Sequence, residues 1–234
     1  GIIHRDVLMA KIVAIQVRGD AGRSERTIAS YLEALKERPV FNEREAERYL
    51  LLARDLPGYD VRLTLRPAGT RPGEVIGEVA VVKTPFAIDA NIQNYGSHAV
   101  GPFGGLIRGE AYDLLGLGDR LTAGFYSTPD FDEQHVVQLG YDLRAGREGL
   151  TIGGRFTYAW TEPDLGPNAG AKLFSRTLVA AGEVSYPFLR SQAANIRAAG
   201  GLEVIDQHAD FAPTNGTRTR LSQDNIRALY VRLD

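Results

Sequence analysis

The stretch Leu150-Thr-Ile-Gly-Gly-Arg-Phe-Thr-Tyr-Ala-Trp160 alternates apolar residues with polar or small ones. A period of two places the apolar side chains on one face of a β-strand and the others on the opposite face. Ordinary strands have about 5–6 residues, whereas a strand tilted by about 45° needs about 9–11 residues to cross a bilayer. The length and the period of this stretch therefore predict a membrane-crossing β-strand.

The same alternation recurs after residue 84, in about eight segments separated by turns rich in Gly, Asp, Asn and Pro. Aromatic residues stand near the segment ends, as in the interfacial girdles of outer-membrane barrels. Short turns such as 146–148 and longer connections such as 161–172 also fit that architecture. We expect about eight antiparallel transmembrane β-barrel strands. The alternative is a large soluble β-sandwich or a lipocalin-like barrel.

One face of these segments carries the charged and amide side chains, and an outer-membrane barrel turns such a face toward its hydrated lumen. Acids and arginines are mixed along it, as expected for a lumen lining; a soluble enzyme could instead use two of the acids as a catalytic pair. The residues that we expect to face the lumen are Asp89, Asn91, Gln93, Arg108, Glu110, Asp142, Arg144, Arg155, Glu183, Arg197 and Glu203.

The first 84 residues have a different pattern, which predicts a small α+β unit. Residues 28–35 have apolar side chains at helical spacing, and Asn42 with Glu45 forms the sequence signature of a capping box that begins a second helix. Segments 59–66 and 75–82 alternate as strands. The order is β-α-α-β-β, which gives one sheet with two helices on one face. The first strand is expected to place Ile12 and Ala14 on one face, and Val13, Ile15 and Val17 on the other.

The composition argues against several classes of protein. The net charge is −2, from 27 Lys and Arg against 29 Asp and Glu, without the basic excess of a nucleic-acid-binding protein. The chain has no Cys, and its four His residues are far apart in sequence, so neither a thiolate site nor a short metal-ligand spacing is present. Phosphate-binding and nucleophile-elbow motifs are also missing. We expect no catalytic activity, no cofactor, no metal and no nucleic-acid partner.

Four stretches carry a resemblance to a known family. Residues 47–58 (ERYLLLARDLPG) and 61–67 (VRLTLRP) resemble the last POTRA domain of the two-partner secretion transporters, which are outer-membrane proteins that export haemolysins and filamentous adhesins. Residues 94–97 (NYGS) and 115–121 (LGLGDRL) resemble the first barrel hairpins of the same family. The β-α-α-β-β order is the POTRA order, and the resemblance covers nearly the whole chain.

The chain also departs from this family. Its members carry an N-terminal plug helix, two POTRA domains, a sixteen-stranded barrel and an inward loop with a VRGY/F-type motif, whereas this sequence has one POTRA-like unit and about half of the strands. The resemblance therefore implies an internal fragment. Residues 1–84 would be a POTRA-like periplasmic domain, either whole or truncated at its start, and residues 85–234 the N-terminal part of an outer-membrane β-barrel.

The resemblance implies a transporter in the Gram-negative outer membrane, with its POTRA domain in the periplasm. Its partners would be outer-membrane lipid and a secreted client of the adhesin or haemolysin type, which the POTRA domain recognises and the barrel pore translocates. In the family fold the strand 60–66 lies at a sheet edge, where an extended client can add a strand. The client-binding residues would then be Arg62, Thr64 and Arg66. A protein insertase of the same superfamily and a soluble β-rich binding protein or enzyme are the alternatives.

Overall fold

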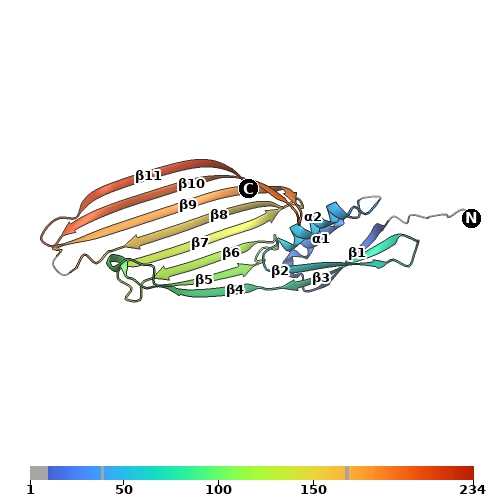
Figure 1. Ribbon diagram of the computed structural model, residues 1–234, viewed down its shortest axis with the longest axis horizontal. Coiled ribbons are helices and arrows are strands. Elements are labelled where there is room, and N and C mark those ends of the chain that lie inside the picture. The colour runs from blue at the N-terminus through green and yellow to red at the C-terminus, as the bar shows by residue number, and fades with distance from the viewer. Residues whose placement is uncertain (1–9, 38–39, 167–168) are drawn as a thin grey trace, which may run out of the picture.

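The computed structural model of the chain describes residues 10–37, 40–166 and 169–234. The first nine residues of the expected 1–84 unit and two residues of the expected connection 161–172 lie outside these ranges. The described residues form two sheets, a three-stranded sheet in the order β1-β3-β2 and an eight-stranded sheet in the order β11-β10-β9-β8-β7-β6-β5-β4 (Figure 1). We call the second one the long sheet.

The three-stranded sheet and two helices form an α+β unit. In it β3 is the central strand, parallel to β1 and antiparallel to β2. The predicted order β-α-α-β-β is confirmed, and β2 lies at an edge of the sheet, as expected. The elements are β1 (Lys11–Gly19), the short 3-10 helix η1 (Gly22–Ser24), α1 (Glu25–Glu33), α2 (Glu43–Arg54), β2 (Tyr59–Pro67) and β3 (Glu74–Lys83).

Both ends of α2 follow from local sequence. The Asn42 side chain accepts a hydrogen bond from the backbone N–H of Arg44 at 3.0 Å, which satisfies one of the free donors of the first turn. After the helix, Gly58 has a φ of +77°, a conformation that strongly favours glycine. A Cβ at Gly58 would lie 2.6 Å from the Cβ of Tyr112, so the missing side chain also lets the α+β unit approach the long sheet.

The expected faces of β1 are wrong because the strand contains an irregularity. Ile12 pairs with Val75 of β3 and Ala14 pairs with the next residue, so one residue of β1 is skipped between them. A bulge of this kind reverses the side-chain alternation beyond it. As a result Ile15 and Val17 pack against the same core as Ile12, instead of lying on the opposite face.

The core of the α+β unit lies between the sheet and the helices. α1 contributes Ile28, Tyr31 and Leu32, which are fully buried. Their i, i+3, i+4 spacing is the amphipathic stripe that the sequence predicts. Leu52 of α2 and Leu56 just beyond its end are also buried in this core.

Each strand of the long sheet pairs antiparallel with the next one in the chain, and the predicted number of eight strands is confirmed. The sequence did not predict β5 as a strand. Its first residues, Gly104 and Gly105, read as part of a hairpin turn, and glycines there interrupt the alternation. The strands are β4 (Phe86–Gln93), β5 (Gly104–Tyr112), β6 (Arg120–Ser127), β7 (Gln134–Ala145), β8 (Leu150–Thr161), β9 (Ala171–Arg190), β10 (Asn195–Pro213) and β11 (Thr219–Leu233), and a short 3-10 helix η2 (His98–Val100) precedes β5.

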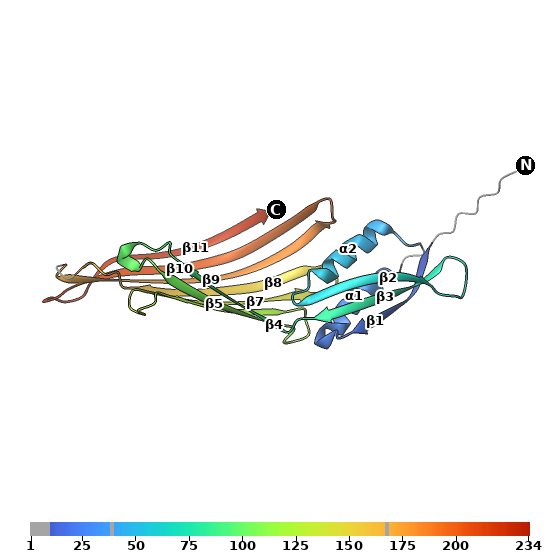
Figure 2. The same cartoon turned by 60° about the horizontal axis from the view of Figure 1, so that its bottom comes forward.

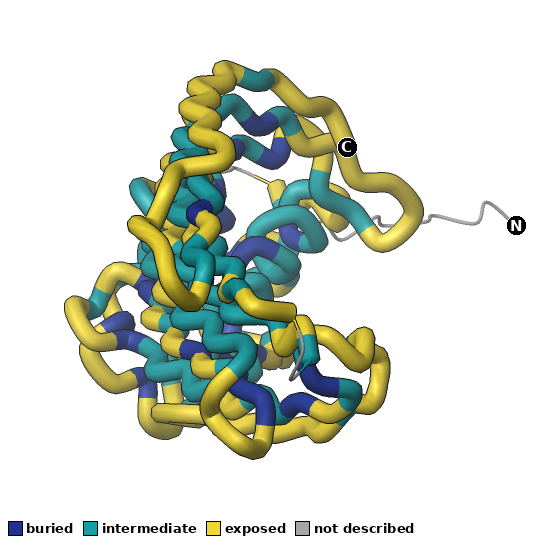
Figure 3. The backbone as a smooth tube through the Cα atoms, turned by 90° about the vertical axis from the view of Figure 1, so that its left-hand side faces the viewer, coloured by how far each residue is buried: buried dark blue, intermediate teal, exposed yellow. Residues whose placement is uncertain are grey.

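The long sheet is curved but not closed, because β4 and β11 have no partner on their outer sides among the described residues. The α+β unit lies at the end of the sheet where β4 begins and β9 ends, which we call the inner end (Figures 1 and 2). Viewed along the long axis, the helices of the unit lie on the concave side of the sheet (Figure 3). In the described part of the chain, none of the helices has the length and hydropathy needed to span a membrane.

Candidate functional site

Cross-strand pairing places all of the expected lumen residues on one face of the long sheet. Directly opposed residues share a face, and so do residues two apart along a strand. Asp89 is opposite Arg108, Glu110 is opposite Thr122, and Arg155 is opposite both Gly140 and Ala181. We call this face the polar face. It carries Asp89, Asn91, Gln93, Arg108, Glu110, Asp142, Arg144, Arg155, Glu183, Arg197 and Glu203.

The other face, which we call the apolar face, exposes large hydrophobic side chains on its outermost strands. Ile92 of β4 is 86% exposed, and Leu229 and Val231 of β11 are 86% and 89% exposed. Exposed apolar surface of this extent marks a contact with lipid or with another protein. The two faces of one sheet therefore differ in the way that the two faces of a membrane barrel do.

The outer boundary of the apolar face crosses the strands obliquely. Beyond the apolar residues, the first charged side chain is Arg176 on β9, Asp206 on β10 and Arg227 on β11. Asp206 is two residues closer to the inner end than His208, which is the partner of Arg176, and Arg227 is two residues closer than Asn225, the partner of Asp206. The boundary shifts by two residues from strand to strand, as expected when tilted strands cross a flat layer.

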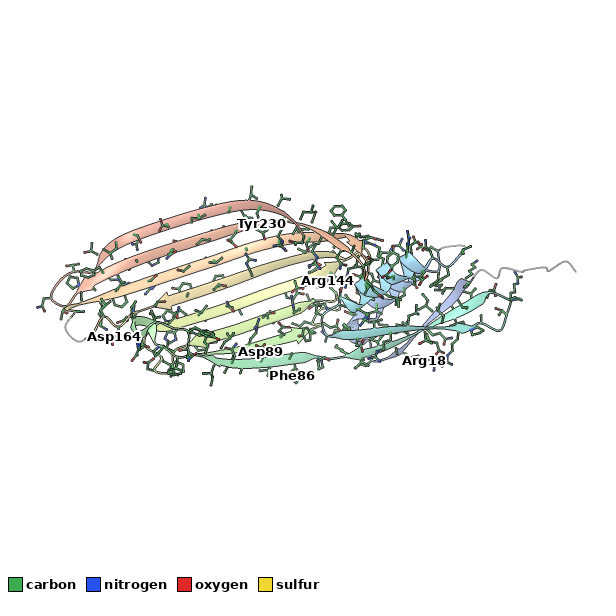
Figure 4. All side chains as sticks on the ribbon, viewed as in Figure 1. Arg18, Phe86, Asp89, Arg144, Asp164 and Tyr230 are labelled. Atoms are coloured by element: carbon green, nitrogen blue, oxygen red, sulfur yellow. The ribbon has the colours of Figure 1, made fainter. Side chains whose placement is uncertain are left out.

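The charges on the polar face are mostly paired with one another. Arg108 lies 3.3 Å from Asp89 near the beginning of β4. Asp142 accepts from Arg120 at 2.9 Å and from Arg144 at 2.7 Å, and Arg144 lies at the inner end of the sheet (Figure 4). These side chains are partly exposed, so the pairs contribute little stability. The acids Asp89 and Asp142 are thereby held by arginines, which suits a hydrated lining better than a pair of free catalytic acids.

A groove runs along the free edge of β2, between that strand and α2. Its cavity has a volume of about 690 Å³ and is lined by Phe41 and Leu50 on one side and by Arg62 and Leu63 on the other. An extended peptide placed here can pair with the open strand edge and insert apolar side chains next to the helix. The sequence analysis predicted the edge but missed the contribution of Phe41 and Leu50.

The three expected client-binding residues lie on the face of β2 that the helices leave open. Arg62 is paired with Asp60 at 2.8 Å, and Arg66 with Glu78 at 2.9 Å. Thr64 is exposed between them. Only Arg62 also lines the groove, so the structure brings the three residues together on one strand without placing all of them in the groove.

A buried carboxylate joins the α+β unit to the long sheet. Asp113 follows β5 directly, its side chain has no exposure, and its φ is +59°. Its carboxylate accepts hydrogen bonds from the backbone N–H of Arg23 at 2.9 Å, from the hydroxyls of Ser24 and Tyr59, and from Lys83 Nζ at 2.9 Å. Burial by itself would raise the pKa of Asp113, but hydrogen bonds from Ser24, Tyr59 and Lys83 outweigh it and hold the pKa below its usual value.

The loop after Asp113 also takes part in the contact between the α+β unit and the long sheet. The Asp119 carboxylate accepts from the backbone N–H groups of Leu114, Leu115 and Leu117 at 3.1–3.2 Å, which holds the loop closed. The backbone N–H of Gly118 then donates to the Ser24 hydroxyl at 3.0 Å. Sequence analysis missed this role, although two aspartates that bracket a glycine-containing loop are a usable signal.

A second set of contacts joins α2 to the turns at the inner end of the long sheet. Arg190 donates to both oxygens of Asp55, at 2.7 and 2.8 Å. The Tyr49 hydroxyl donates to Glu148 at 2.8 Å, and the backbone N–H of Gln192 donates to Glu47 at 2.7 Å. Burial, followed by the hydrogen bond to Glu148, raises the pKa of Tyr49. Together with the Asp113 junction, these contacts keep the helices over the inner end of the polar face.

The chain matches no protein-family model and no curated protein sequence. Its fold, however, is similar to that of several solved structures. CdiB from Escherichia coli matches 97% of this chain with a TM-score of 0.79 and 16% sequence identity, and CdiB from Acinetobacter baumannii matches 96% with a TM-score of 0.70 and 14% identity. BamA from Haemophilus ducreyi, in a structure lacking POTRA domains 1–3, matches 95% with a TM-score of 0.59 and 13% identity.

This chain spans 42% of the length of each CdiB structure and 43% of the BamA structure. At these identities the likeness shows the fold alone: the chain has the fold of the matching parts of the CdiB and BamA structures over nearly its whole length. The resemblance expected from the sequence is confirmed at the level of the fold.

Proposed function

We propose that the chain is part of an outer-membrane transporter that carries an unfolded, exported polypeptide across the membrane, as in two-partner secretion. The observation that carries this proposal is the contrast between the two faces of the long sheet. Closed into a barrel, such a sheet pairs its backbone groups within the lipid and turns the polar face inward. The eleven polar-face residues would then line a hydrated path for the client.

Among the described residues the long sheet is not closed, so closure into a barrel would use further strands. The free sides of β4 and β11 would pair with further strands of a longer protein, consistent with the chain's share of about two fifths of the structures it matches. In the proposal, residues 85–234 are the N-terminal part of that barrel. Residues 1–84 are a POTRA-like domain on the periplasmic side.

The client would first bind in the groove beside β2. The open strand edge offers backbone donors and acceptors to any extended sequence, while Phe41, Leu50 and Leu63 contact its side chains. Arg62, Thr64 and Arg66 would contact the client on the open face of the strand. The periplasm has no ATP, so folding of the adhesin- or haemolysin-type client outside the cell would prevent its return.

An insertase for outer-membrane proteins is the second candidate function, and the likeness to BamA favours it. It would use the same groove and barrel but release its client sideways into the bilayer. We rank it second because the likeness to the two CdiB structures is greater, with TM-scores of 0.79 and 0.70 against 0.59. A soluble binding protein or enzyme ranks last because it would have to cover the exposed apolar face of the long sheet.

The first test is fractionation of Gram-negative cells that make the full-length protein, in comparison with the same cells after deletion of its gene. Extraction from the outer membrane only by detergent, together with loss of one large secreted protein when the gene is deleted, supports the proposal. Outer-membrane location with loss of barrel proteins instead of a secreted protein favours the insertase. Recovery in the soluble fraction contradicts both.

The groove has its own test. Leu65→Pro removes a backbone donor that points to the free side of β2, because Leu65 and Gly77 form a non-hydrogen-bonded pair of the ladder, and should weaken client binding by tenfold or more. Leu65→Val keeps that donor and serves as the matched control. Melting curves of both variants separate a loss of binding from a loss of folding. Unchanged binding by a folded Leu65→Pro protein would contradict binding at the strand edge.

A further inference from the structure

A cavity of about 370 Å³ lies between the α+β unit and the polar face of the long sheet. The unit contributes Tyr31, Leu52 and Asp55, and residues of β6 to β10 contribute the opposite side. The cavity is at the inner end of the sheet, where Figure 4 shows Arg144 next to the helices. In the proposed function this is the end of the lumen at which the client would enter. The arginines that line it are Arg120, Arg144, Arg155 and Arg197.

Tyr31 brings an unpaired donor to the cavity. The residue has no exposure to solvent, and its hydroxyl has no hydrogen-bond partner among the described residues. A buried hydroxyl without a partner destabilises the folded state. Burial also raises the pKa of Tyr31, so the phenol keeps its proton at neutral pH. The Tyr31 hydroxyl can therefore donate a hydrogen bond to a ligand in the cavity.

Three of the lining arginines are already paired within the sheet. Arg120 and Arg144 share one carboxylate, that of Asp142, at 2.9 and 2.7 Å. Arg155 donates to Glu203, which lies outside the cavity lining. Two guanidinium groups thus compete for a single acid at Asp142, which leaves an excess of positive charge there.

The other two acids of the lining do not correct this excess. The two carboxylate oxygens of Asp55 accept from Nε and Nη2 of Arg190. Glu183 accepts from the Tyr230 hydroxyl at 2.7 Å and lies 3.5 Å from Arg232. The side chain of Arg197 has neither a hydrogen bond nor an ion pair within the described ranges. The cavity therefore contains a free guanidinium, a free hydroxyl donor and more positive than negative charge.

We propose that this cavity binds a carboxylate side chain of the exported polypeptide as the extended chain enters the lumen. Arg197 supplies the counter-charge and Tyr31 a hydrogen bond, and a bond to a charged acceptor is stronger than one to a neutral acceptor. Gly140 and Gly153 carry no side chains on the opposite wall, so a peptide backbone can approach there. The inference rests on the proposed function, because it assigns a binding site to the same client.

The test uses the full-length protein in detergent and two short flexible peptides. One peptide contains Gly, Ser and Glu, and the other has Gln in place of each Glu. Binding is measured by fluorescence anisotropy at low salt, where screening of the charge is weakest. The Glu peptide should bind about tenfold more tightly than the Gln peptide, as one charged contact would give.

Two variants locate the binding site. Tyr31→Phe removes the free hydroxyl without changing the packed ring, and Arg197→Gln removes the free charge. Each should reduce the preference for Glu severalfold, and Tyr31→Phe should melt no lower than the unmodified protein, because the hydroxyl has no partner to lose. Arg176→Gln, on the opposite face of β9, is the matched control and should keep the preference.

Equal binding of the two peptides would overturn the proposal, and so would a preference that survives both cavity variants or disappears in Arg176→Gln. The fractionation experiment gives a separate answer on the proposed function. If no secreted protein depends on the gene while the Glu preference still maps to Tyr31 and Arg197, the transport function fails and the carboxylate site stands. If export depends on the gene and the peptides bind equally, only the site fails.

Discussion

The α+β unit places its apolar side chains inside, whereas the long sheet places them outside. Among the described residues, every buried hydrophobic residue belongs to the unit, to the residues that connect its strands and helices, or is Ala199 of β10. The long sheet has instead a row of exposed Ile, Leu and Val on one face and paired charges on the other. The first region is stabilised by packing, and the second depends on its backbone ladder and on its surroundings.

The junction between the two regions should give the largest effect. Asp113→Ala removes an acceptor for four donors and leaves Lys83 without its counter-charge in a buried place. Breaking a buried pair from one side typically costs about 3–5 kcal/mol. We expect faster hydrogen exchange at the amides of β2, β3 and the loop 113–119. Asp89→Ala on the polar face is the control, because its ion pair with Arg108 is largely exposed. Similar exchange in both variants would show that the junction is not a determinant of stability.

That junction also shows the limit of what the sequence predicts. The two-residue period predicts the side of every polar-face residue, because alternation along a strand is local information. Asp113 meets Ser24, Tyr59 and Lys83, which lie 30 to 89 residues away in sequence. A local sequence pattern cannot relate residues that are so far apart in sequence. The junction and the cavity beside Tyr31 can therefore be identified only from the structure.

Two errors have local causes. In β5 the glycines Gly104, Gly105 and Gly109 interrupt the apolar alternation, and the first two of them read as the end of a turn. In β1 the skipped residue between Ile12 and Ala14 reverses the alternation, and nothing in the residue types marks its place. Period-based reasoning therefore succeeds for regular strands and fails where a strand is glycine-rich or bulged.

A pair of leucines tests the difference in packing directly. Leu32 of α1 is fully buried, whereas Leu229 of β11 is 86% exposed on the apolar face. Leu32→Ala should destabilise the α+β unit by about 2–5 kcal/mol, because it leaves a cavity in the core. Leu229→Ala leaves no cavity and should change the stability of neither region much. Free energies of opening from native-state hydrogen exchange provide the measurement. A comparable loss at both sites would contradict the inside-outside contrast.

Two adjacent residues on β7 test the two faces of the long sheet. Leu139 lies on the apolar face and Gln138 on the polar face. Leu139→Arg places a charge against lipid and should cost about 2–4 kcal/mol near the bilayer centre. Gln138→Arg adds the same side chain to a hydrated surface and should be nearly neutral. Urea titration of the full-length protein in lipid vesicles measures both. If the two variants were equally costly, the polar face would not line a lumen.

The smallest effect should be the dependence of the stability of the junction on pH. It arises only from the difference between the pKa of the Asp113 carboxyl in the folded protein and its pKa in the unfolded protein. The pKa of Asp113 is lowered from 3.8 in the folded protein, so its carboxylate contributes stability that is present well above pH 3.8. That contribution is lost as the pH falls below 3.8 and through the folded-state pKa. Asp113→Asn cannot ionise and should lack this part of the acid sensitivity. The free energy of opening, measured by hydrogen exchange at the β3 amides, should therefore fall more steeply with decreasing pH in the unmodified protein than in the variant. Equal slopes would mean that the donors around Asp113 do not favour its charged form, and the junction would then be held by packing, like the rest of the α+β unit.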